Sequence, residues 1–206
     1  MRIQEQFRKR VYSNKDVFLN DFRAFVRALP SFLKAYVFGK LERAFVEKIF
    51  VAVSTINSCK YCSWIHLKLG LKSGTNLQDV YNLISLIHDT GNIKDEREAF
   101  TIAFASYYVD SRGELDRCII ERFRSMYPPD MAKAIISCIQ VINFANLVAN
   151  TFEGFLDHLL KRRRSRNIWL KFAIFLLSSP ICLPLSLILK MNKSEIDPSS
   201  GYLKSD

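Results

Sequence analysis

The chain has few residues that break helices. Its 206 residues include only seven Gly and six Pro, which argues against a sandwich or barrel of short strands joined by many tight turns. No stretch shows a sustained period-two alternation of apolar and polar residues, the pattern of a half-buried strand. The sequence therefore predicts an all-α fold.

A secretory leader and a disulfide framework are also missing from the sequence. The first sixteen residues, MRIQEQFRKRVYSNKD, contain no apolar core of the kind that a leader needs. Five cysteines are an odd number in a chain of this length. We therefore expect a reducing, cytoplasmic setting, in which a Cys-x-x-Cys pair usually serves redox or metal chemistry.

Acidic residues are scarce near the C-terminus. From residue 161 onward nine Lys and Arg residues stand against three acidic ones, whereas the first 160 residues carry 21 basic and 17 acidic groups. The net charge of +10 thus belongs largely to the tail. The body shows no basic face with interleaved aromatic side chains, so we expect no binding to nucleic acid.

Apolar residues at helical spacing divide the first 160 residues into a bundle of helices. The expected helices cover residues 17–29, 31–40, 41–57, 59–72, 76–91, 93–109, 114–127 and 130–160. Pro30 is predicted to end the first of them, because proline removes a backbone donor and clashes with the preceding turn. The helix over 41–57 is apolar nearly all round, which predicts a buried helix.

Two of these helices show a weak sequence similarity to each other. An offset of 86 places IFVAVSTIN (49–57) over IISCIQVIN (135–143), so that Asn57 meets Asn143. Under the same offset the residues that follow are aligned as Cys59 with Ala145, Cys62 with Val148 and His66 with Phe152. Either a weak internal duplication or the chance similarity of two apolar helices explains this alignment.

The stretch CKYCSWIH (59–66) carries the reactive residues. Cys59 and Cys62 are one helical turn apart, so both sulfurs can share a face and close a disulfide. Ser58 is the expected N-cap, and a helix start favours the thiolate, which is the nucleophile. His66 follows Cys62 by one turn, within reach for proton transfer. Glu47 lies in the preceding apolar helix, where a carboxylate needs a partner or a task.

Two other interpretations of these residues remain open. Zinc could be held by Cys59, Cys62 and His66 with Glu47 as the fourth ligand, although structural zinc usually takes its ligands from two separated pairs. Inert packing of both cysteines would leave Glu47 and His66 unexplained. Cys118 and Cys138 lie among apolar helical neighbours and are predicted to be buried without a chemical role.

The spacing Glu47-x11-Cys59-x2-Cys62-x3-His66 resembles the signature of the carboxymuconolactone decarboxylase-like superfamily. More narrowly, it is similar to the AhpD-like alkyl hydroperoxidase branch, and the resemblance covers about residues 35–158. Asn57 and Tyr61 also match the wording of that motif. Some members have a second histidine where this chain has Tyr61, which removes one candidate proton carrier.

The resemblance implies an all-helical domain that assembles as a homo-oligomer, a trimer or a multiple of one. It implies a peroxidase cycle without a cofactor other than the redox-active dithiol. In that cycle Cys62 attacks a hydroperoxide, Cys59 resolves the product to a disulfide, and Glu47 with His66 relays protons. A lipoyl-bearing or thioredoxin-like dithiol then restores the thiols. The alternative is a non-catalytic module that senses redox state or binds metal and is tethered to a membrane by its tail.

The tail differs in character from the helical domain over 1–160. Residues 161–191 combine a basic cluster with an apolar run, and residues 192–206 are polar and expected to be disordered. The uncharged run from Phe172 to Leu189 is eighteen residues long, the lower limit for a membrane span. The basic cluster suits anionic lipid headgroups, and its members are Lys161, Arg162, Arg163, Arg164 and Arg166. A span, an interfacial anchor and packing on a neighbouring subunit all fit this pattern, and membrane association at the cytoplasmic face fits best.

Overall fold

The computed structural model describes residues 9–75, 95–161 and 167–191, and every regular element within these residues is a helix. In chain order the elements are α1 (Lys15–Phe32), the π-helix η2 (Leu33–Val37), α2 (Arg43–Ile56), α3 (Lys60–Lys72), α5 (Glu96–Asp110), α6 (Arg117–Met126), α7 (Pro129–Lys161) and α8 (Ile168–Met191). The all-α prediction is confirmed. The helix expected over 76–91, most of the basic cluster and the tail after residue 191 lie outside the described residues.

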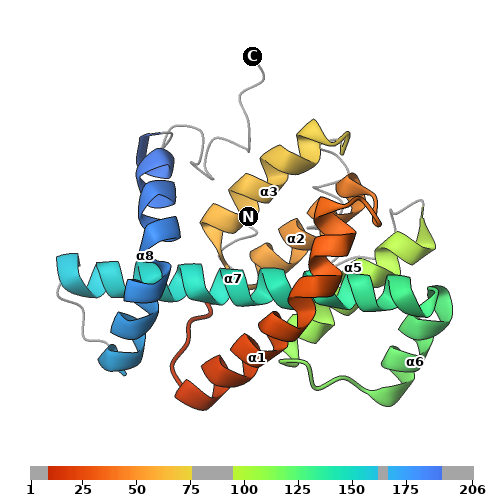
Figure 1. Cartoon of the computed structure of the whole chain (residues 1–206), viewed down its shortest axis with the longest axis horizontal. Coiled ribbons are helices and arrows are strands. Elements are labelled where there is room, and N and C mark those ends of the chain that lie inside the picture. The colour runs from red at the N-terminus through yellow and green to blue at the C-terminus, as the bar shows by residue number, and fades with distance from the viewer. Residues whose placement is uncertain (1–8, 76–94, 162–166, 192–206) are drawn as a thin grey trace, which may run out of the picture.

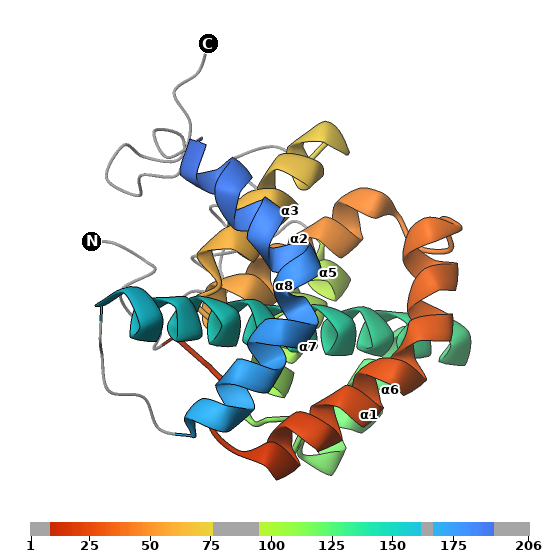
Figure 2. The ribbon, with the colours of Figure 1, turned by 60° about the vertical axis from the view of Figure 1, so that its left-hand side comes forward.

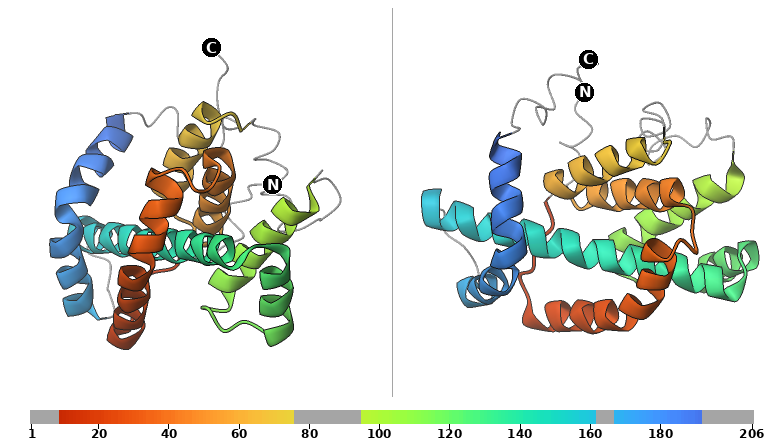
Figure 3. Two further views of the ribbon diagram at one scale, coloured as in Figure 1. Left: turned by 45° about the vertical axis from the view of Figure 1, so that its right-hand side comes forward. Right: turned by 45° about the horizontal axis from the view of Figure 1, so that its top comes forward.

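The long helix α7 is the axis of the molecule (Figure 1). Helices α1, α2 and α8 pack against it, and α2 also packs against α3 and α5. Seen with its top tilted forward, the molecule shows α2 and α3 side by side above α7 (Figure 3). A single long helix thus supports both the helix pair of the dithiol motif and the C-terminal helix.

The core lies where α2, α5, α6 and α7 meet. Val46, Val53 and Ile139 are buried there, and the Phe104 and Phe123 rings stack with centroids 4.0 Å apart. Ten of the fourteen residues of α2 are buried, as expected for a helix with neighbours on three sides. The prediction of a buried helix over this segment is confirmed.

Pro30 does not end the first helix, contrary to the prediction. Helix α1 continues through it to Phe32, and the chain then runs as the π-helix η2 to Val37. The wider hydrogen-bonding pattern of a π-turn accommodates a local irregularity within a helix. The apolar side of α1 packs on α7, and this burial offsets the hydrogen bond that proline cannot donate.

Within the part of the chain that the structure describes, two helices are long and apolar enough to cross a membrane by length and composition alone. The first, residues 129–160, has 56% of its most apolar window buried within the protein, as expected for the core helix that it is. The second, residues 168–187, has only 11% of that window buried. Helix α8 therefore differs from α7 in presenting most of its apolar surface outward.

Candidate redox site

The turn between α2 and α3 positions the two cysteines. Ser58 adopts a left-handed conformation with φ of 51°, and the amide of Cys59 donates to the Ser54 carbonyl at 2.9 Å. Cys59 itself is the N-cap of α3 and makes no side-chain capping bond. The prediction that Ser58 caps this helix is therefore wrong. Ser58 supplies the sharp reversal that lets a new helix start directly beside the end of α2.

Buried asparagines hold this turn in place. The Asn57 side chain, which is fully buried, donates to Oδ1 of Asn143 at 2.9 Å. Asn150 donates its side-chain amide to the Asn57 carbonyl at 2.8 Å. Because Asn143 and Asn150 both belong to α7, the long helix fixes where α2 ends and α3 begins. Sequence reasoning identified Asn57 as part of the motif and missed the role of Asn150.

The two motif cysteines are in contact. Their sulfur atoms lie 2.6 Å apart, and both residues are free cysteines. Cys59 is completely buried, whereas Cys62 is half-buried. A disulfide between them therefore needs no backbone rearrangement. Of the two residues, Cys62 has the larger exposed surface.

The Cys62 thiol is not predisposed to ionise. Its pKa is raised well above the ordinary value of a thiol, chiefly because of the hydrogen-bonded contact with Cys59 and also because of burial. A backbone hydrogen bond at the start of α3 does lower this pKa, as expected, but the neighbouring sulfur and the loss of water outweigh it. Thiol chemistry at this site needs a base.

A buried carboxylate and an imidazole form the second half of the site. Glu47 is only 1% exposed, and its Oε2 lies 2.7 Å from Nδ1 of His66. Its Oε1 accepts hydrogen bonds from the Tyr36 hydroxyl at 2.6 Å and from Nε of Arg43 at 2.9 Å. The buried carboxylate thus has three partners, and these interactions offset the cost of placing a charge in the interior.

These partners keep Glu47 ionised. Burial by itself would raise the pKa of this carboxyl, but the hydrogen bonds from His66, Tyr36 and Arg43 outweigh burial and lower it. The same contact raises the pKa of Tyr36, after burial, so its hydroxyl keeps its proton and donates it. The Arg43 guanidinium also covers the Tyr36 ring, 3.6 Å from the centroid. Sequence reasoning missed both partners, although Arg43 precedes Glu47 by the four residues typical of a helical ion pair.

The carboxylate fixes the tautomer of His66. A neutral imidazole whose Nδ1 donates to a carboxylate carries its lone pair on Nε2. The ring also packs edge-on against Phe50, with centroids 4.7 Å apart, and this contact limits its rotation. His66 lies one turn beyond Cys62 on α3, so the helix connects the imidazole to the dithiol. The carboxylate can stabilise the imidazolium that forms when Nε2 of His66 takes up a proton.

The zinc arrangement of the four motif residues is not formed in this structure. Among residues 9–75, 95–161 and 167–191, no three His, Cys, Asp or Glu side chains converge as metal ligands. Both oxygens of Glu47 are already engaged by other side chains of the protein.

The remaining cysteines lie in three different environments. Cys138 is buried, as predicted, and burial raises the pKa of its thiol to about 12. Cys118 is exposed, so the prediction that it is buried is wrong: the helix α6 that carries it packs through another face, which buries Phe123. Cys182, on α8, is half-buried.

A cavity of about 740 Å³ lies between the N-terminal segment and helices α1, α5 and α7. Arg10, Asp21, Arg112 and Gln140 line it, together with Asn57 from the turn before the dithiol. None of its lining residues is a cysteine, a histidine or Glu47. The cavity is therefore separate from the redox site.

Comparisons of the chain with protein-family models, with curated protein sequences and with solved structures found no match.

Proposed function

We propose that the protein is a dithiol oxidoreductase that reduces hydrogen peroxide or organic hydroperoxides, in the manner of an AhpD-like alkyl hydroperoxidase. One observation supports this most strongly. Two sulfurs in contact, at 2.6 Å, share one short helix with an imidazole held 2.7 Å from a buried carboxylate. A structural role for the cysteines would require neither the imidazole nor the buried charge.

The first step is the oxidation of Cys62. His66 accepts the thiol proton at Nε2, and Glu47 stabilises the imidazolium that forms. The Cys62 thiolate attacks the terminal oxygen of the hydroperoxide, the O–O bond breaks, and the proton on His66 passes to the departing alkoxide. The products are an alcohol and Cys62 sulfenic acid.

The second step closes the disulfide. The Cys59 thiol attacks the sulfur of the sulfenic acid, a disulfide forms, and one molecule of water leaves. The contact between the sulfurs makes this step intramolecular and fast relative to attack by a thiol from solution. Two thiols are thereby oxidised for each hydroperoxide reduced to an alcohol and water.

A lipoyl-bearing or thioredoxin-like protein completes the cycle. Because Cys59 is completely buried and Cys62 is half-buried, the thiolate of the reductant attacks Cys62. Cys59 leaves as a thiolate and takes up a proton, and the second thiol of the reductant then releases Cys62.

The chain assembles into a homo-oligomer, a trimer or a multiple of one. Large apolar side chains remain exposed along α1 and η2, including Val26 and Val37, and the next residue, Phe38, has 79% of its surface accessible. An exposed apolar patch of this kind favours contact with another protein surface. Light scattering coupled to size-exclusion chromatography gives the number of copies.

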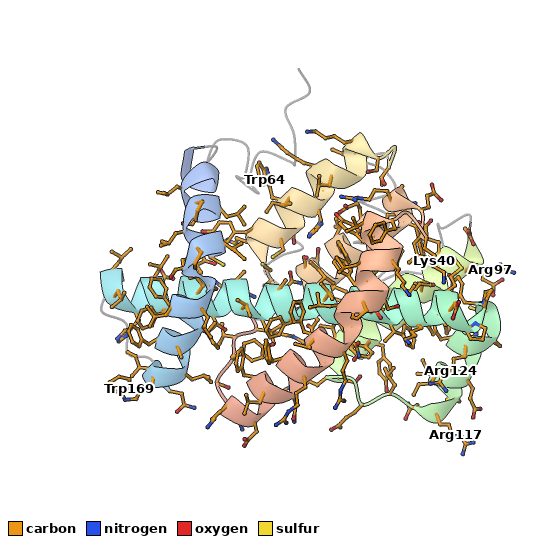
Figure 4. The ribbon with its side chains drawn as sticks, in the orientation of Figure 1. Lys40, Trp64, Arg97, Arg117, Arg124 and Trp169 are labelled. Atoms are coloured by element: carbon orange, nitrogen blue, oxygen red, sulfur yellow. The ribbon has the colours of Figure 1, made fainter. Side chains whose placement is uncertain are left out.

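We further propose that helix α8 anchors the enzyme at the cytoplasmic face of an anionic membrane. Trp169, Leu177 and Ile181 are 80%, 76% and 73% exposed, and Trp169 points away from the body at the start of the helix (Figure 4). The basic residues 161–166 directly precede this face. An apolar helix face beside a basic cluster is typical of an interfacial anchor. At this location lipid hydroperoxides become the natural organic substrates.

The membrane proposal has a direct test. The full chain should sediment with vesicles that contain phosphatidylserine and remain in the supernatant with purely phosphatidylcholine vesicles. A chain ending at residue 160, or the double variant Leu177→Asp with Ile181→Asp, should stay in the supernatant with both. Equal sedimentation of the full and shortened chains with the phosphatidylserine vesicles would show that α8 is not a membrane anchor.

The catalytic proposal is tested by turnover of a hydroperoxide with a dithiol reductant. We expect the unaltered chain and the variant Cys118→Ser, which changes an exposed cysteine, to consume peroxide over many turnovers. The variant Cys62→Ser should consume none. Stoichiometric oxidation of the thiols without turnover would favour a redox sensor, and one equivalent of zinc in the isolated protein would favour the metal-binding alternative.

A further inference from the structure

Tyr36 belongs to the π-helix η2 and contacts the redox site from outside the dithiol motif. The chain leaves α1 through η2 and then turns back into α2 (Figure 2). A π-turn contains one residue more than an α-turn, and such turns are frequent at functional sites. Within η2, Val37 is exposed, whereas the Tyr36 hydroxyl donates to Oε1 of the buried Glu47 at 2.6 Å. The π-helix therefore carries one side chain into the site while its neighbour faces outward.

Two series of contacts connect the Tyr36 side chain to the His66 ring. The first is polar: the hydroxyl binds Oε1 of Glu47, and Oε2 of the same carboxylate lies 2.7 Å from Nδ1 of His66. The second is aromatic: the Phe50 ring lies 5.4 Å from the Tyr36 ring and 4.7 Å from the His66 ring, measured between centroids. The carboxylate is thus held between two side chains that are themselves fixed relative to each other.

Other contacts leave the Glu47 side chain little freedom. Nε of Arg43 donates to Oε1 at 2.9 Å, and the same guanidinium lies over the Tyr36 ring. On the side of α3, a Cβ added at Gly70 would lie 3.4 Å from Cβ of Glu47, so the two helices approach closely one turn after His66. Donors from η2 and α2 therefore occupy Oε1, which leaves Oε2 for the imidazole.

Helices α5 and α7 also pack on α2, and each adds a titratable group. Glu98 of α5 pairs with Lys48 of α2 at 2.6 Å, so its carboxylate is occupied by a cation of its own. Cys138 of α7 contributes to the raised pKa of Tyr36, after burial and Glu47. Burial raises the pKa of Cys138 to about 12, so this thiol is uncharged at neutral pH. Neither group competes with the Tyr36 hydroxyl for Glu47.

We propose that Tyr36 is a positioning residue of the redox site, which holds Glu47 against His66 by occupying the other carboxylate oxygen. The proposal extends the proposed function and rests on it for the role of the imidazole as a base. The hydroxyl keeps its proton and stabilises the charge of the buried carboxylate, which without this donor would be protonated more readily. The carboxylate in turn accepts the Nδ1 proton of His66, so that Nε2 keeps its lone pair.

The variant Tyr36→Phe removes the hydroxyl and keeps the ring that packs on Phe50. Its control is Tyr12→Phe, which removes a hydroxyl that donates to another carboxylate, Asp21, at 2.9 Å. Full chains are labelled with ¹³C at the Glu side-chain carboxyl and titrated by NMR, and the Glu47→Gln variant identifies the signal. We expect the titration midpoint of Glu47 to rise by about one pH unit in Tyr36→Phe and to stay unchanged in Tyr12→Phe. Circular dichroism confirms that each variant is folded.

A kinetic measurement on the same variants tests the effect on the dithiol. Reduced protein is mixed with tert-butyl hydroperoxide between about pH 5 and pH 8, quenched with an alkylating agent and digested with trypsin. Cleavage after Lys60 and Lys68 isolates Cys62 in peptide 61–68, whose alkylated fraction reports the rate. In Tyr36→Phe the acid side of the rate profile should move upward by about one pH unit, which lowers the rate there by up to about tenfold. Tyr12→Phe should keep the profile of the unaltered chain, because a loss of stability alone does not move it.

The two measurements have separate outcomes. An unchanged Glu47 midpoint in the folded Tyr36→Phe protein overturns the proposal, and so does an unchanged rate profile despite a shifted midpoint. If the hydroperoxide does not oxidise Cys62 even in the unaltered chain, the peroxidase is removed instead. The NMR midpoints then decide by themselves whether Tyr36 holds the carboxylate.

Discussion

Residues 49–66 and residues 135–152 are two apolar segments that align at an offset of 86 and fold differently. The first leaves α2 at Ile56, reverses at Ser58 and begins α3, whereas the second continues as one unbroken helix inside α7. The aligned residues Asn57 and Asn143 are hydrogen-bonded to each other at 2.9 Å. The two segments therefore contact each other at the position where α2 has ended and α7 continues.

The comparison shows what a reactive site requires beyond apolar packing. The reversal in the first segment places Cys62 and His66 on a helix that folds back along α2, beside Glu47. In the second segment the helix has no reversal, so the residue aligned with Cys59 is the exposed Ala145 and the residue aligned with His66 is Phe152, which is 2% exposed and packs on α8. The break in the helix, and not the apolar pattern, creates the site.

Moving the cysteines to the second segment tests whether their spacing alone creates the site. Cysteines at positions 145 and 148, in a chain with Cys59→Ser and Cys62→Ser, would have the same spacing without a helix start, an imidazole or a carboxylate beside them. We expect a complete loss of hydroperoxide turnover with dithiol reductant. Turnover near that of the unaltered chain would mean that the spacing alone suffices.

The offset aligns His66 with Phe152. Replacement of His66 by alanine should mainly lower the rate of Cys62 oxidation, and replacement of Phe152 should mainly lower the stability. His66→Ala removes the base and should lower the rate of Cys62 oxidation by about 10² to 10⁴-fold. It should lower the free energy of unfolding by about 1–3 kcal/mol, because the buried Glu47 loses one of its partners. Phe152→Ala removes a buried ring and should lower the free energy of unfolding by about 3–5 kcal/mol. Stopped-flow peroxide kinetics and urea denaturation measure the two effects, and equal losses in both assays would contradict the assignment.

Glu47 and Lys133 form a second aligned pair, one buried and one exposed. Glu47→Gln keeps the shape and removes the charge that Arg43 and His66 contact, so the free energy of unfolding should fall by about 1.5–3 kcal/mol. Lys133→Gln should change it by about 0.5 kcal/mol or less. Urea denaturation at neutral pH measures both values, and a Glu47→Gln protein as stable as the unaltered chain would show that the carboxylate charge does not stabilise the site.

Glu47→Gln should also change how the free energy of unfolding depends on pH. The pKa of Glu47 is lower in the folded protein than the ordinary value of 4.5, so the stability that it contributes is present above pH 4.5 and is lost as the pH falls through the folded-state value. Unfolding of the unaltered chain should therefore become easier over that acid range. The Glu47→Gln protein should show a flatter profile, and parallel profiles would contradict the lowered pKa.

The smallest expected effect concerns the titration of Cys62. Because its pKa is raised well above the ordinary thiol value of 9.0, alkylation by iodoacetamide should keep accelerating above pH 9, without a plateau. Cys59→Ala removes the largest cause of the shift and should lower the pKa, which speeds alkylation at neutral pH. The alkylated fraction of peptide 61–68 is measured against peptide 118–122, which carries the exposed Cys118. A plateau near pH 7 would show that the helix start dominates after all.

Much of the fold could be predicted from the local sequence. The scarcity of Gly and Pro predicted helices, and the helix after Cys59 ends at Ser73 and Gly74 as expected. The course of the chain at Pro30 was not predictable from the local pattern, because the packing of α1 on α7 outweighs the preference of proline for a helix end. The exposure of Cys118 likewise depends on which face of α6 the core accepts.

The site was predictable in its residues and less so in its surroundings. The spacing of Glu47, Cys59, Cys62 and His66 predicted which side chains belong together, and the contacts between Glu47 and His66 and between the cysteines are present. The raised pKa of Cys62 depends on burial and on the contact between the sulfurs, and only the folded structure supplies both.

A single turnover reports directly whether the dithiol reduces a hydroperoxide. Reduced protein is mixed with one equivalent of an organic hydroperoxide, quenched with acid and alkylating agent, and digested with trypsin, which separates Cys59 in peptide 49–60 from Cys62 in peptide 61–68. We expect one equivalent of alcohol and a disulfide that joins peptide 49–60 to peptide 61–68. Intact hydroperoxide together with both peptides recovered as alkylated thiols would contradict it.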